Sequence, residues 1–247
     1  MASTDNIDEQ EFLADYNPQD YPGPLVTVDI AIFTLIDGQL HVLLVQRGNH
    51  PARGQWALPG GFIDADRDQS LSAAAMRKLH EKTGVQAPYL EQVCTVGDAS
   101  RDPRGWSVTA LYMALMAHAP TAAFVESVTD ARWWPLTSAL AKDLAFDHNH
   151  LLEAARQRLS NKTAYTVLPV HILDAPFTLT QLQQAFEEVL GAPLEKKSFR
   201  RRILSADILD EMGEAPPPGG RGRPAALFRP KPGLEDHAFV RVVGEGK

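Results

Sequence analysis

The feature that most constrains the fold is a Gly-Gly turn, Gly60-Gly61, that precedes a segment rich in Ala, Leu, Met, Lys and Glu. These residue types favour a helix, which we expect over residues 70–82. Gly84 follows directly and is typical of a helix C-cap, because glycine adopts the left-handed conformation without strain. The sequence therefore predicts a tight loop that leads into a helix of three to four turns.

Strands are predicted on both sides of this loop and helix. Two β-branched, apolar runs at about 25–35 and 39–47 flank Asp37-Gly38, a dipeptide that supplies the positive φ angles of a hairpin turn. Further strands are expected within 91–98, 106–117 and 131–136, and Asp147 is expected to cap a helix with apolar residues at helical spacing. We therefore expect an α/β/α sandwich over residues 21–160, after a flexible lead-in at 1–20.

A second unit is predicted over residues 161–232, followed by a tail at 233–247. Thr178 and Gln181 have the spacing of a capping box, which opens a helix that Gly191 closes. A second helix is expected at about 197–212, and a Pro- and Gly-rich turn then leads to a short strand at 225–229. Helix, turn, helix, loop and strand is the order of a winged helix-turn-helix domain.

Charge is distributed unevenly along the 247 residues. The whole chain carries a formal charge of −7, but residues 194–230 hold eight Lys or Arg against five Asp or Glu. This part therefore carries +3 and the remainder −10, which indicates a basic C-terminal module in an acidic protein. The lone Cys94 makes no internal disulfide, no apolar run reaches the roughly 20 residues of a membrane span, and the acidic start lacks a secretory pattern. We expect a cytoplasmic protein with no membrane partner, which would be bound to the nucleoid if the basic module binds DNA.

The loop and helix at 60–85 resemble the Nudix signature, in which a Gly-Gly turn precedes a helix carrying Arg-Glu-x-x-Glu-Glu. In that family the helix carboxylates hold a divalent metal, which bridges a nucleoside diphosphate and polarises the attacking water. In the matching stretch that begins at Arg77, only Glu81 remains of the three acids, and Lys78 and Lys82 replace the other two. The family's earlier Glu aligns with Gln69.

The two lysines lie four residues apart and therefore share one helix face. Each repels a metal cation by about 1 kcal/mol or more at a few ångströms, and two ligands are lost as well. The sequence thus predicts no catalytic residue, no metal ligand, and little or no metal-dependent hydrolysis. The simpler alternative is an amphipathic helix with a solvated basic face, which the preceding Leu-Pro-Gly-Gly-Phe disfavours.

Loss of the metal need not remove ligand binding, because the glycine-rich turn and the arginines remain. The loop 97–106 holds two arginines and a tryptophan, which suit phosphate groups and a nucleotide ring, although a solvated loop explains it equally well. The predicted effector-binding residues are Arg47, Gly60, Gly61, Arg77, Glu81, Arg101, Arg104 and Trp106.

The segment 195–209 predicts a helix with one apolar and one basic face. With Phe199 as the origin and 100° per residue, Ile203 falls at about 40°, Lys197 at about 160° and Arg201 at about 200°. A basic helix face is usually only solvated, but a neighbouring Gly- and Arg-rich loop ahead of a strand suits a DNA-contacting wing. The predicted DNA-binding residues are Lys197, Ser198, Arg200, Arg201, Arg202, Arg221 and Arg223.

Five motifs, at 54–62, 77–84, 101–109, 197–202 and 220–225, occur in the order found in one bacterial family. The chain resembles the Nudix-related transcriptional regulators of NAD metabolism, the NrtR family. The resemblance implies a homodimeric repressor with an N-terminal Nudix domain and a C-terminal winged helix, which controls genes of NAD synthesis or salvage. It also implies release from palindromic double-stranded operator DNA by ADP-ribose or a related nucleotide, with no cofactor required.

Two other functions stay open at this point. One is an active ADP-ribose pyrophosphatase with an accessory C-terminal domain, in which Asp64, Asp66 and Asp68 of the lengthened loop recruit metal instead of forming a solvated turn. The other is a protein-interaction module that binds neither DNA nor nucleotide. The two histidines at 148 and 150 indicate a helix start and not a metal site, because residues two apart do not face each other on a helix.

Overall fold

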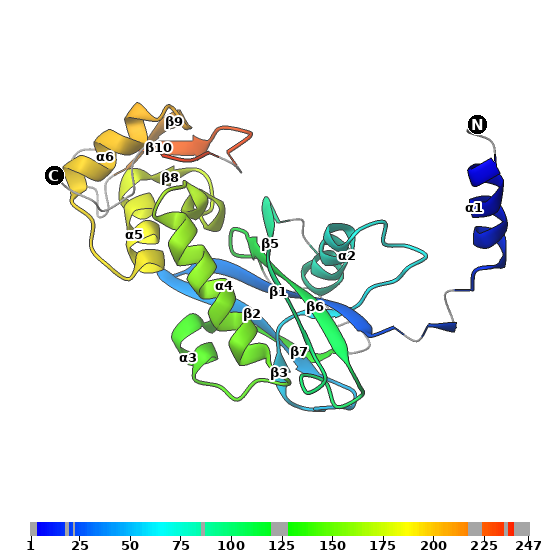
Figure 1. The fold of residues 1–247 in the computed structure, drawn as a ribbon. Helices are drawn as coiled ribbons and strands as arrows, with labels where there is room; N and C mark the ends of the chain where they lie inside the picture. Colours follow the sequence, from blue (N-terminus) through cyan, green and yellow to red (C-terminus); the bar gives the residue numbers. More distant parts are fainter. Residues whose placement is uncertain are drawn as a thin grey trace.

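The computed structural model describes residues 4–17, 20–21, 23–84, 87–119, 128–216, 224–234 and 237–239. The N-terminal part of the fold is built on a seven-stranded sheet, and the C-terminal part on a helix pair with a three-stranded sheet (Figure 1). Within the described ranges, no helix has the length and apolar character that a membrane crossing requires.

The large sheet is mixed and has the hairpin at its centre. β1 (Leu25–Ile36) and β2 (Gln39–Arg47) pair antiparallel as predicted, with Asp37 at φ 49° and Gly38 at φ 79° in the turn. β1 also runs parallel to β6 (Ser107–Leu115), and β5 (Tyr89–Asp98) forms the edge beyond it. The remaining strands pair with the hairpin; they are β3 (Trp56–Ala57), β4 (Gly60–Phe62) and β7 (Val128–Pro135).

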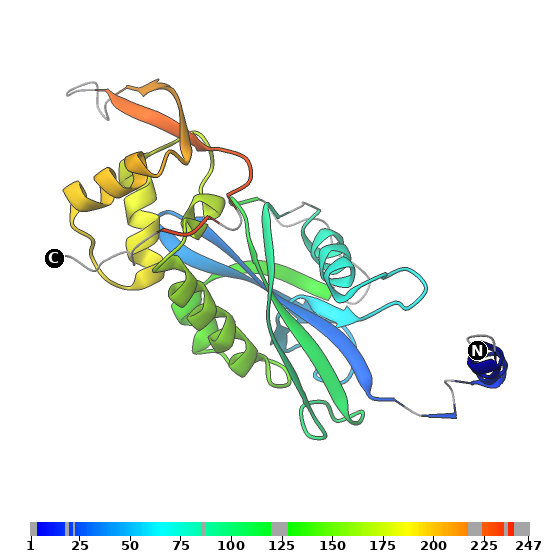
Figure 2. The same ribbon diagram turned by 45° about the horizontal axis from the view of Figure 1, so that its top comes forward.

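Alternation along β1 creates the two faces of the sheet. Val28, Ile30 and Ile32 pack in the core beneath α2 (Leu71–Thr83). Ala31 and Phe33 belong to the opposite core, which α3 (Leu136–Leu140) and α4 (His148–Thr163) cover. The predicted α/β/α sandwich is thus confirmed, and both views show helices on the two sides of the sheet (Figure 2).

The helix after the Gly-Gly loop ends where its sequence predicts. Ser70 accepts a hydrogen bond from the Ala73 amide at 3.1 Å and so caps the start of α2. Gly84 has φ 70° and donates its amide to the carbonyl of His80 at 2.8 Å. These caps fix which residues of α2 face the sheet and which face the loop before it.

The second unit has the order of a winged helix-turn-helix. It consists of the 3-10 helix η2 (Leu168–Ile172), β8 (Phe177–Thr178), α5 (Leu179–Leu190), α6 (Lys196–Ser205), β9 (Leu209–Ala215) and β10 (Ala225–Pro230). The capping box of Thr178 and Gln181 is present, and Gly191 closes α5 in a left-handed conformation. The three strands form a sheet in the order β8-β10-β9.

The second helix is shorter than predicted, so the expected span of 197–212 is wrong at its C-terminal end. α6 stops at Ser205, Asp207 takes a positive φ of 53°, and the chain turns into β9. Residues 209–215 pair with β10 instead of continuing the helix. The sheet pairing outweighs the helix propensity of this segment, and it supplies one arm of the wing.

Helix α5 belongs to both cores. Ala185 and Val189 pack in the core of the large sheet, whereas Leu182 and Phe186 pack in the core of the second unit. Glu188 also accepts a hydrogen bond from the Leu40 amide at 2.9 Å. Helix α5 of the second unit is therefore anchored directly on the β1-β2 hairpin.

Both ends of the chain, the predicted lead-in and the predicted tail, contain described structure. The lead-in contains a helix, α1 (Thr4–Asp15), which lies apart from the sheet in both views (Figures 1 and 2). Beyond the expected boundary at residue 232, Leu234 is buried in the core of the second unit, and Phe239 packs against that core. The Phe239 amide also donates to the Tyr165 carbonyl at 2.7 Å.

Candidate functional sites: a charged cleft and a basic helix

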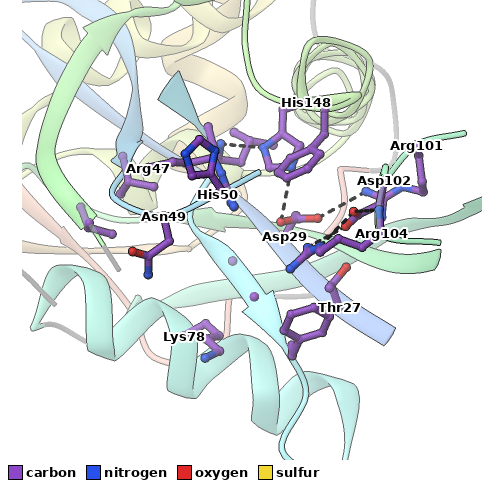
Figure 3. A pocket seen from close by; sticks show the side chains of 18 of the residues that line it. Thr27, Asp29, Arg47, Asn49, His50, Lys78, Arg101, Asp102, Arg104 and His148 are labelled. Carbon is purple, nitrogen blue, oxygen red and sulfur yellow. Dashed lines mark hydrogen bonds and ion pairs between the residues drawn. The ribbon is translucent and has the colours of Figure 1, made fainter. Parts of the chain in front are cut away.

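A cleft of about 410 Å³ opens between the Gly-Gly loop, α2 and the start of α4. Figure 3 shows Lys78 on one side of it and His148 on the other, with Asp29 of β1 between them. Its lining is dominated by charged and aromatic groups: Asp29, Arg47, Phe62, Lys78, Glu81, Arg101, Asp102, Arg104, Phe146 and His148.

Arg47, at the end of β2, is a cation in the cleft that can bind an anionic ligand. Its Nε donates to the carbonyl of Pro51 at 2.9 Å, and its guanidinium carbon lies 4.6 Å from the ring centroid of Phe146. Burial, and then the charge of Arg104, lower the pKa of Arg47. The charges of Asp102 and Asp29 act on Arg47 from a distance, but no carboxylate in the described part of the chain forms a direct ion pair with it, so its guanidinium can still pair with an anion that enters the cleft.

Arg104 provides a second cation at the opening. Its guanidinium lies 4.8 Å from the ring centroid of Phe62, and it binds Asp102 with Nε at 3.0 Å and Nη2 at 2.6 Å. The hydrogen bond from Arg104 holds the pKa of Asp102 below its usual value. The side chain of Arg104 is 38% exposed and is therefore accessible to a ligand.

The floor of the cleft is a buried charge network. Arg101 places Nε and Nη2 each 3.0 Å from the two carboxylate oxygens of Asp147, and Nη1 donates to Ser107 at 3.3 Å. Its Nη2 also lies 3.7 Å from Oδ2 of Asp29, which accepts a hydrogen bond from Thr109 at 2.8 Å. Asp147 is the N-cap residue of α4, as predicted, but its side chain makes no capping hydrogen bond, because its carboxylate holds Arg101 instead.

His148 completes the floor in its neutral form. The Leu58 amide donates to its Nδ1 at 2.9 Å, so this nitrogen carries no proton, and Nε2 lies 3.7 Å from Oδ1 of Asp29. Burial, which outweighs the attraction of Asp29 and Asp147, lowers the pKa of His148. The cleft thus holds its histidine as a hydrogen-bonding group and not as a charge.

The burial of His148 predicts that the free energy of unfolding depends on pH. His148 has an ordinary pKa of 6.5 when unfolded and a lower one when folded, so the unfolded state binds the proton more readily. The free energy of unfolding should therefore fall as the pH drops below about 6.5 and be insensitive to this group above it. Urea unfolding between pH 5 and pH 8, for the native protein and for His148→Asn, measures how steeply the free energy of unfolding changes with pH. This pH dependence should be smaller in His148→Asn.

His150→Asn is the control, because it changes an exposed histidine of the same helix and should keep the native pH dependence. An equal loss of pH dependence in both variants contradicts the assignment to His148.

The acids and bases of α2 are paired with one another. Arg77 binds Asp68 at 2.7 Å and 2.5 Å, and its Nη1 lies 3.0 Å from Glu81. Lys78 lies 3.4 Å from the other oxygen of Glu81. Burial raises the pKa of Glu81, but the hydrogen bond from Arg77 and the charge of Lys78 outweigh it and leave that pKa low.

A divalent metal does not fit this arrangement. Lys78 places an ammonium where the resembled motif has an acid, and Glu81, the one acid left in that motif, is neutralised by Arg77 and Lys78. Among the described residues, no group of three or more His, Cys, Asp or Glu side chains is suitable as a metal site. Lys82 lies in the last turn of α2, and its side chain is outside the described part of the structure.

Six of the eight predicted effector residues line the cleft, and two do not. Arg77 is held by Asp68 and Glu81 behind the cleft wall, and Trp106 is exposed beside Gly97. Those that line it are Arg47, Gly60, Gly61, Glu81, Arg101 and Arg104.

Sequence reasoning missed several lining residues, because they come from separate segments. Asp29 is the one charged residue in the otherwise uncharged strand β1 and is the clearest overlooked signal, since a buried strand seldom carries an acid without a partner elsewhere in the fold. His148 and Phe146 belong to the start of α4, where the sequence indicates only a helix cap. Lys78 was read as a lost metal ligand, and the structure places it in the cleft wall as a cation.

The helix α6 presents a basic outer face. Phe199 and Ile203 are buried, and the Phe199 ring packs edge-on against Phe186 at 5.2 Å. Lys197 and Arg201 lie opposite them and are exposed. This confirms the predicted division of the helix into an apolar and a basic face.

The start of α6 is capped by Glu195, and two further arginines of the helix contact neighbouring residues. Glu195 accepts hydrogen bonds from the backbone amides of Lys197 at 2.9 Å and Ser198 at 2.7 Å, which caps the helix. Arg200 donates to Thr180 of α5 at 3.1 Å, and the Arg202 guanidinium lies 5.8 Å from the ring centroid of Phe239. Arg221 and Arg223 of the predicted wing lie outside the described residues.

Comparison with known proteins gives the same two units. A NUDIX domain model matches residues 26–155, and an NrtR DNA-binding winged helix domain model matches residues 169–229. A protein of Acinetobacter baylyi that is described as an ADPR responsive transcriptional repressor is 50% identical over 231 residues, which cover 94% of this chain and 91% of the relative.

Two solved structures of Shewanella oneidensis NrtR are also similar. The complex with a 27mer DNA has a TM-score of 0.81 at 50% identity and covers 88% of this chain and 99% of its own. The NUDIX domain complexed with ADP ribose has a TM-score of 0.59 at 55% identity and covers 61% of this chain and 98% of its own. The chain therefore belongs to the NrtR family, in which a Nudix domain precedes a DNA-binding winged helix domain.

Proposed function

We propose that the protein is a homodimeric transcriptional repressor that is released from operator DNA by ADP-ribose or a closely related nucleotide. The observation that carries this proposal is the combination, in one chain, of a cleft lined by cations, Lys78 among them, and a helix with a basic outer face. The similar proteins described as an ADPR responsive repressor, and solved with DNA and with ADP ribose, support it. The family resemblance points to genes of NAD synthesis or salvage as the targets.

The cleft acts in this proposal as a receptor and not as a hydrolase. Arg47, Arg104 and Lys78 supply positive charge for a diphosphate, and no divalent ion is needed to neutralise it. Glu81 is held by Arg77 and Lys78, so it does not serve as a free base for the attacking water. The ligand is therefore bound and released intact.

The proposed DNA contact is the outer face of α6. Lys197 and Arg201 point away from the core, where they can reach phosphates or base edges in a major groove. A twofold-symmetric dimer presents two such helices, which suits a palindromic operator with half-sites about one helical turn or more apart.

The response to the ligand must pass between the cleft and the DNA-binding helices. A ligand shifts DNA affinity only if it prefers an arrangement of the protein that DNA disfavours. Helix α5 packs in both cores and is bonded to the β1-β2 hairpin through Glu188. In this proposal, a change in the Nudix sheet reaches α5 through these direct contacts and not through a flexible linker.

The proposal is tested by titrating a fluorescent inverted-repeat operator fragment with the protein in EDTA, with and without ADP-ribose. We expect tight, salt-sensitive binding to the operator, weak binding to a scrambled duplex, and release on addition of ADP-ribose. Equal affinity for both duplexes, or an affinity that ADP-ribose leaves unchanged, contradicts the proposal.

A further inference from the structure

We propose that Asp29 selects the ligand of the cleft by accepting hydrogen bonds from the hydroxyl groups of a sugar that lies beyond the diphosphate. This inference rests on the proposed function, because it assumes that a diphosphate nucleotide occupies the cleft. It adds the residue that distinguishes a nucleotide with a second ribose from one that ends in phosphate.

The cleft is divided by charge into an opening and a floor. The opening has Arg104, 38% exposed, and Lys78, 19% exposed, together with Arg47. The floor has Asp29 and Arg101, whose side chains are 8% and 5% exposed. Anionic phosphates are therefore expected at the opening, where the cations are accessible.

The floor repels phosphate and accepts hydroxyl groups. The charge of Arg101 is already matched by Asp147, which binds it with two 3.0 Å hydrogen bonds, and His148 is neutral. The carboxylate of Asp29 therefore leaves the floor with a net negative charge. A neutral group that donates hydrogen bonds fits such a floor, whereas a phosphate oxygen does not.

One oxygen of Asp29 remains able to accept a hydrogen bond. Oδ2 is used by Thr109 at 2.8 Å, and Arg101 lies 3.7 Å away. Oδ1 has His148 Nε2 at 3.7 Å, which is longer than a hydrogen bond, and within the described ranges no hydrogen-bond donor contacts it. A ligand hydroxyl can therefore supply the hydrogen bond that this buried carboxylate oxygen lacks.

The backbone of the Gly-Gly loop is shaped around this oxygen. A Cβ atom at Gly60 would lie 2.3 Å from Asp29 Oδ1 and 2.4 Å from the Val28 carbonyl, closer than real contacts allow. Only glycine lets the loop pass while the carboxylate keeps its position in the cleft wall. The loop therefore packs directly against Oδ1, and no side chain at position 60 comes between this oxygen and the cleft.

A ribose with vicinal hydroxyls is the chemical class that this floor recognises. A carboxylate oxygen accepts from a hydroxyl strongly, and a site built to bond a hydroxyl discriminates against ligands that lack it. ADP-ribose carries such a ribose beyond its diphosphate, whereas ADP ends in a phosphate that the floor repels. The cleft should therefore prefer ADP-ribose to ADP through Asp29.

The test is calorimetric titration of ADP-ribose and of ADP into the full-length protein and Asp29→Asn, in EDTA. We expect the native protein to prefer ADP-ribose by about tenfold or more. Asp29→Asn should weaken ADP-ribose binding by about tenfold and leave ADP binding unchanged or tighter, because a repelling charge is gone. Retained ADP binding also shows that the variant cleft is folded.

Glu153→Gln is the matched control, because Glu153 is an exposed acid on α4 that pairs with Arg156 away from the cleft. It should keep the native preference. A variant in which both nucleotides weaken equally, or neither changes, overturns the role of Asp29 while the native affinity for ADP-ribose still supports the proposed function. Absence of ADP-ribose binding by the native protein overturns both.

If Asp29→Asn binds neither nucleotide, Asp29→Ala provides the second variant. It removes the carboxylate and adds no atom that must fit against the Gly-Gly loop. The inference requires this variant to bind ADP and to lose the preference for ADP-ribose, and either a native preference or loss of both ligands in Asp29→Ala overturns it.

Discussion

Replacing Arg201 with alanine is expected to weaken binding to operator DNA by about 10- to 100-fold, which corresponds to ~1–3 kcal/mol. Arg201 is exposed on the outer face of α6, opposite the buried Phe199 and Ile203. Its removal deletes a cationic contact and leaves the packing of the helix intact. Fluorescence anisotropy of a labelled operator at fixed salt measures the change.

Two further variants sharpen this prediction. Arg67→Ala removes another exposed arginine, from the loop before α2, and should leave operator affinity unchanged. Arg202→Ala should have a smaller effect than Arg201→Ala, because the Arg202 guanidinium lies over Phe239 and is half-buried. An Arg201 variant that binds the operator as the native protein does would remove α6 from the DNA interface.

Replacing Lys78 with glutamate is expected to lower the affinity for ADP-ribose in EDTA by about 100-fold. The change places a second carboxylate beside Glu81, where the native ammonium lies 3.4 Å away, and reverses the charge that faces a diphosphate. A direct charge-assisted contact is worth ~1.5–3 kcal/mol, and reversal adds repulsion to its loss. Calorimetry measures the affinity, and the operator titration shows whether ADP-ribose still releases DNA.

The Lys78→Met variant separates charge from shape. It keeps a long side chain without the ammonium, so its affinity should lie between those of the native protein and Lys78→Glu. DNA binding without nucleotide should be native in both variants, since Lys78 lies on α2 and not on α6. Native ADP-ribose affinity in Lys78→Glu contradicts the assignment of this lysine to the diphosphate.

The elements that the sequence predicts best are those with local signals. The hairpin turn at Asp37-Gly38, the Ser70 and Gly84 ends of α2 and the capping box of α5 each depend on residues within a few positions of one another. Such short-range rules carry over directly from sequence to structure. The order of these elements was therefore sufficient to predict both domains.

Prediction failed where distant segments decide the outcome. Residues 206–212 contain no glycine or proline and favour a helix, yet they leave it at Asp207 because β10 offers a pairing partner. Asp147 has the residue type and position of a helix cap, but Arg101, brought near by the fold, takes its carboxylate. In both cases the deciding contact comes from a residue far away in the sequence, which local sequence patterns do not reveal.

The sequence also does not show in which direction a side chain points in the folded protein. Arg77 and Arg101 are both arginines in predicted effector motifs, but one is clamped by Asp68 behind the cleft wall and the other forms the cleft floor. Trp106 was placed in the ligand site because of its residue type, whereas the structure leaves it exposed outside the cleft lining. The charged floor joins β1, the 97–106 loop and the start of α4, a combination that only the folded chain reveals.

The central claim is that lysine at the metal position has converted a hydrolytic cleft into a receptor, and one titration addresses it most directly. Calorimetry of ADP-ribose with the full-length protein in EDTA, followed by chromatography of the recovered nucleotide, measures binding and hydrolysis in the same sample. The account predicts saturable binding without metal and intact ADP-ribose, with no AMP on later addition of magnesium or manganese. Binding that requires the metal, together with rapid formation of AMP, would contradict it.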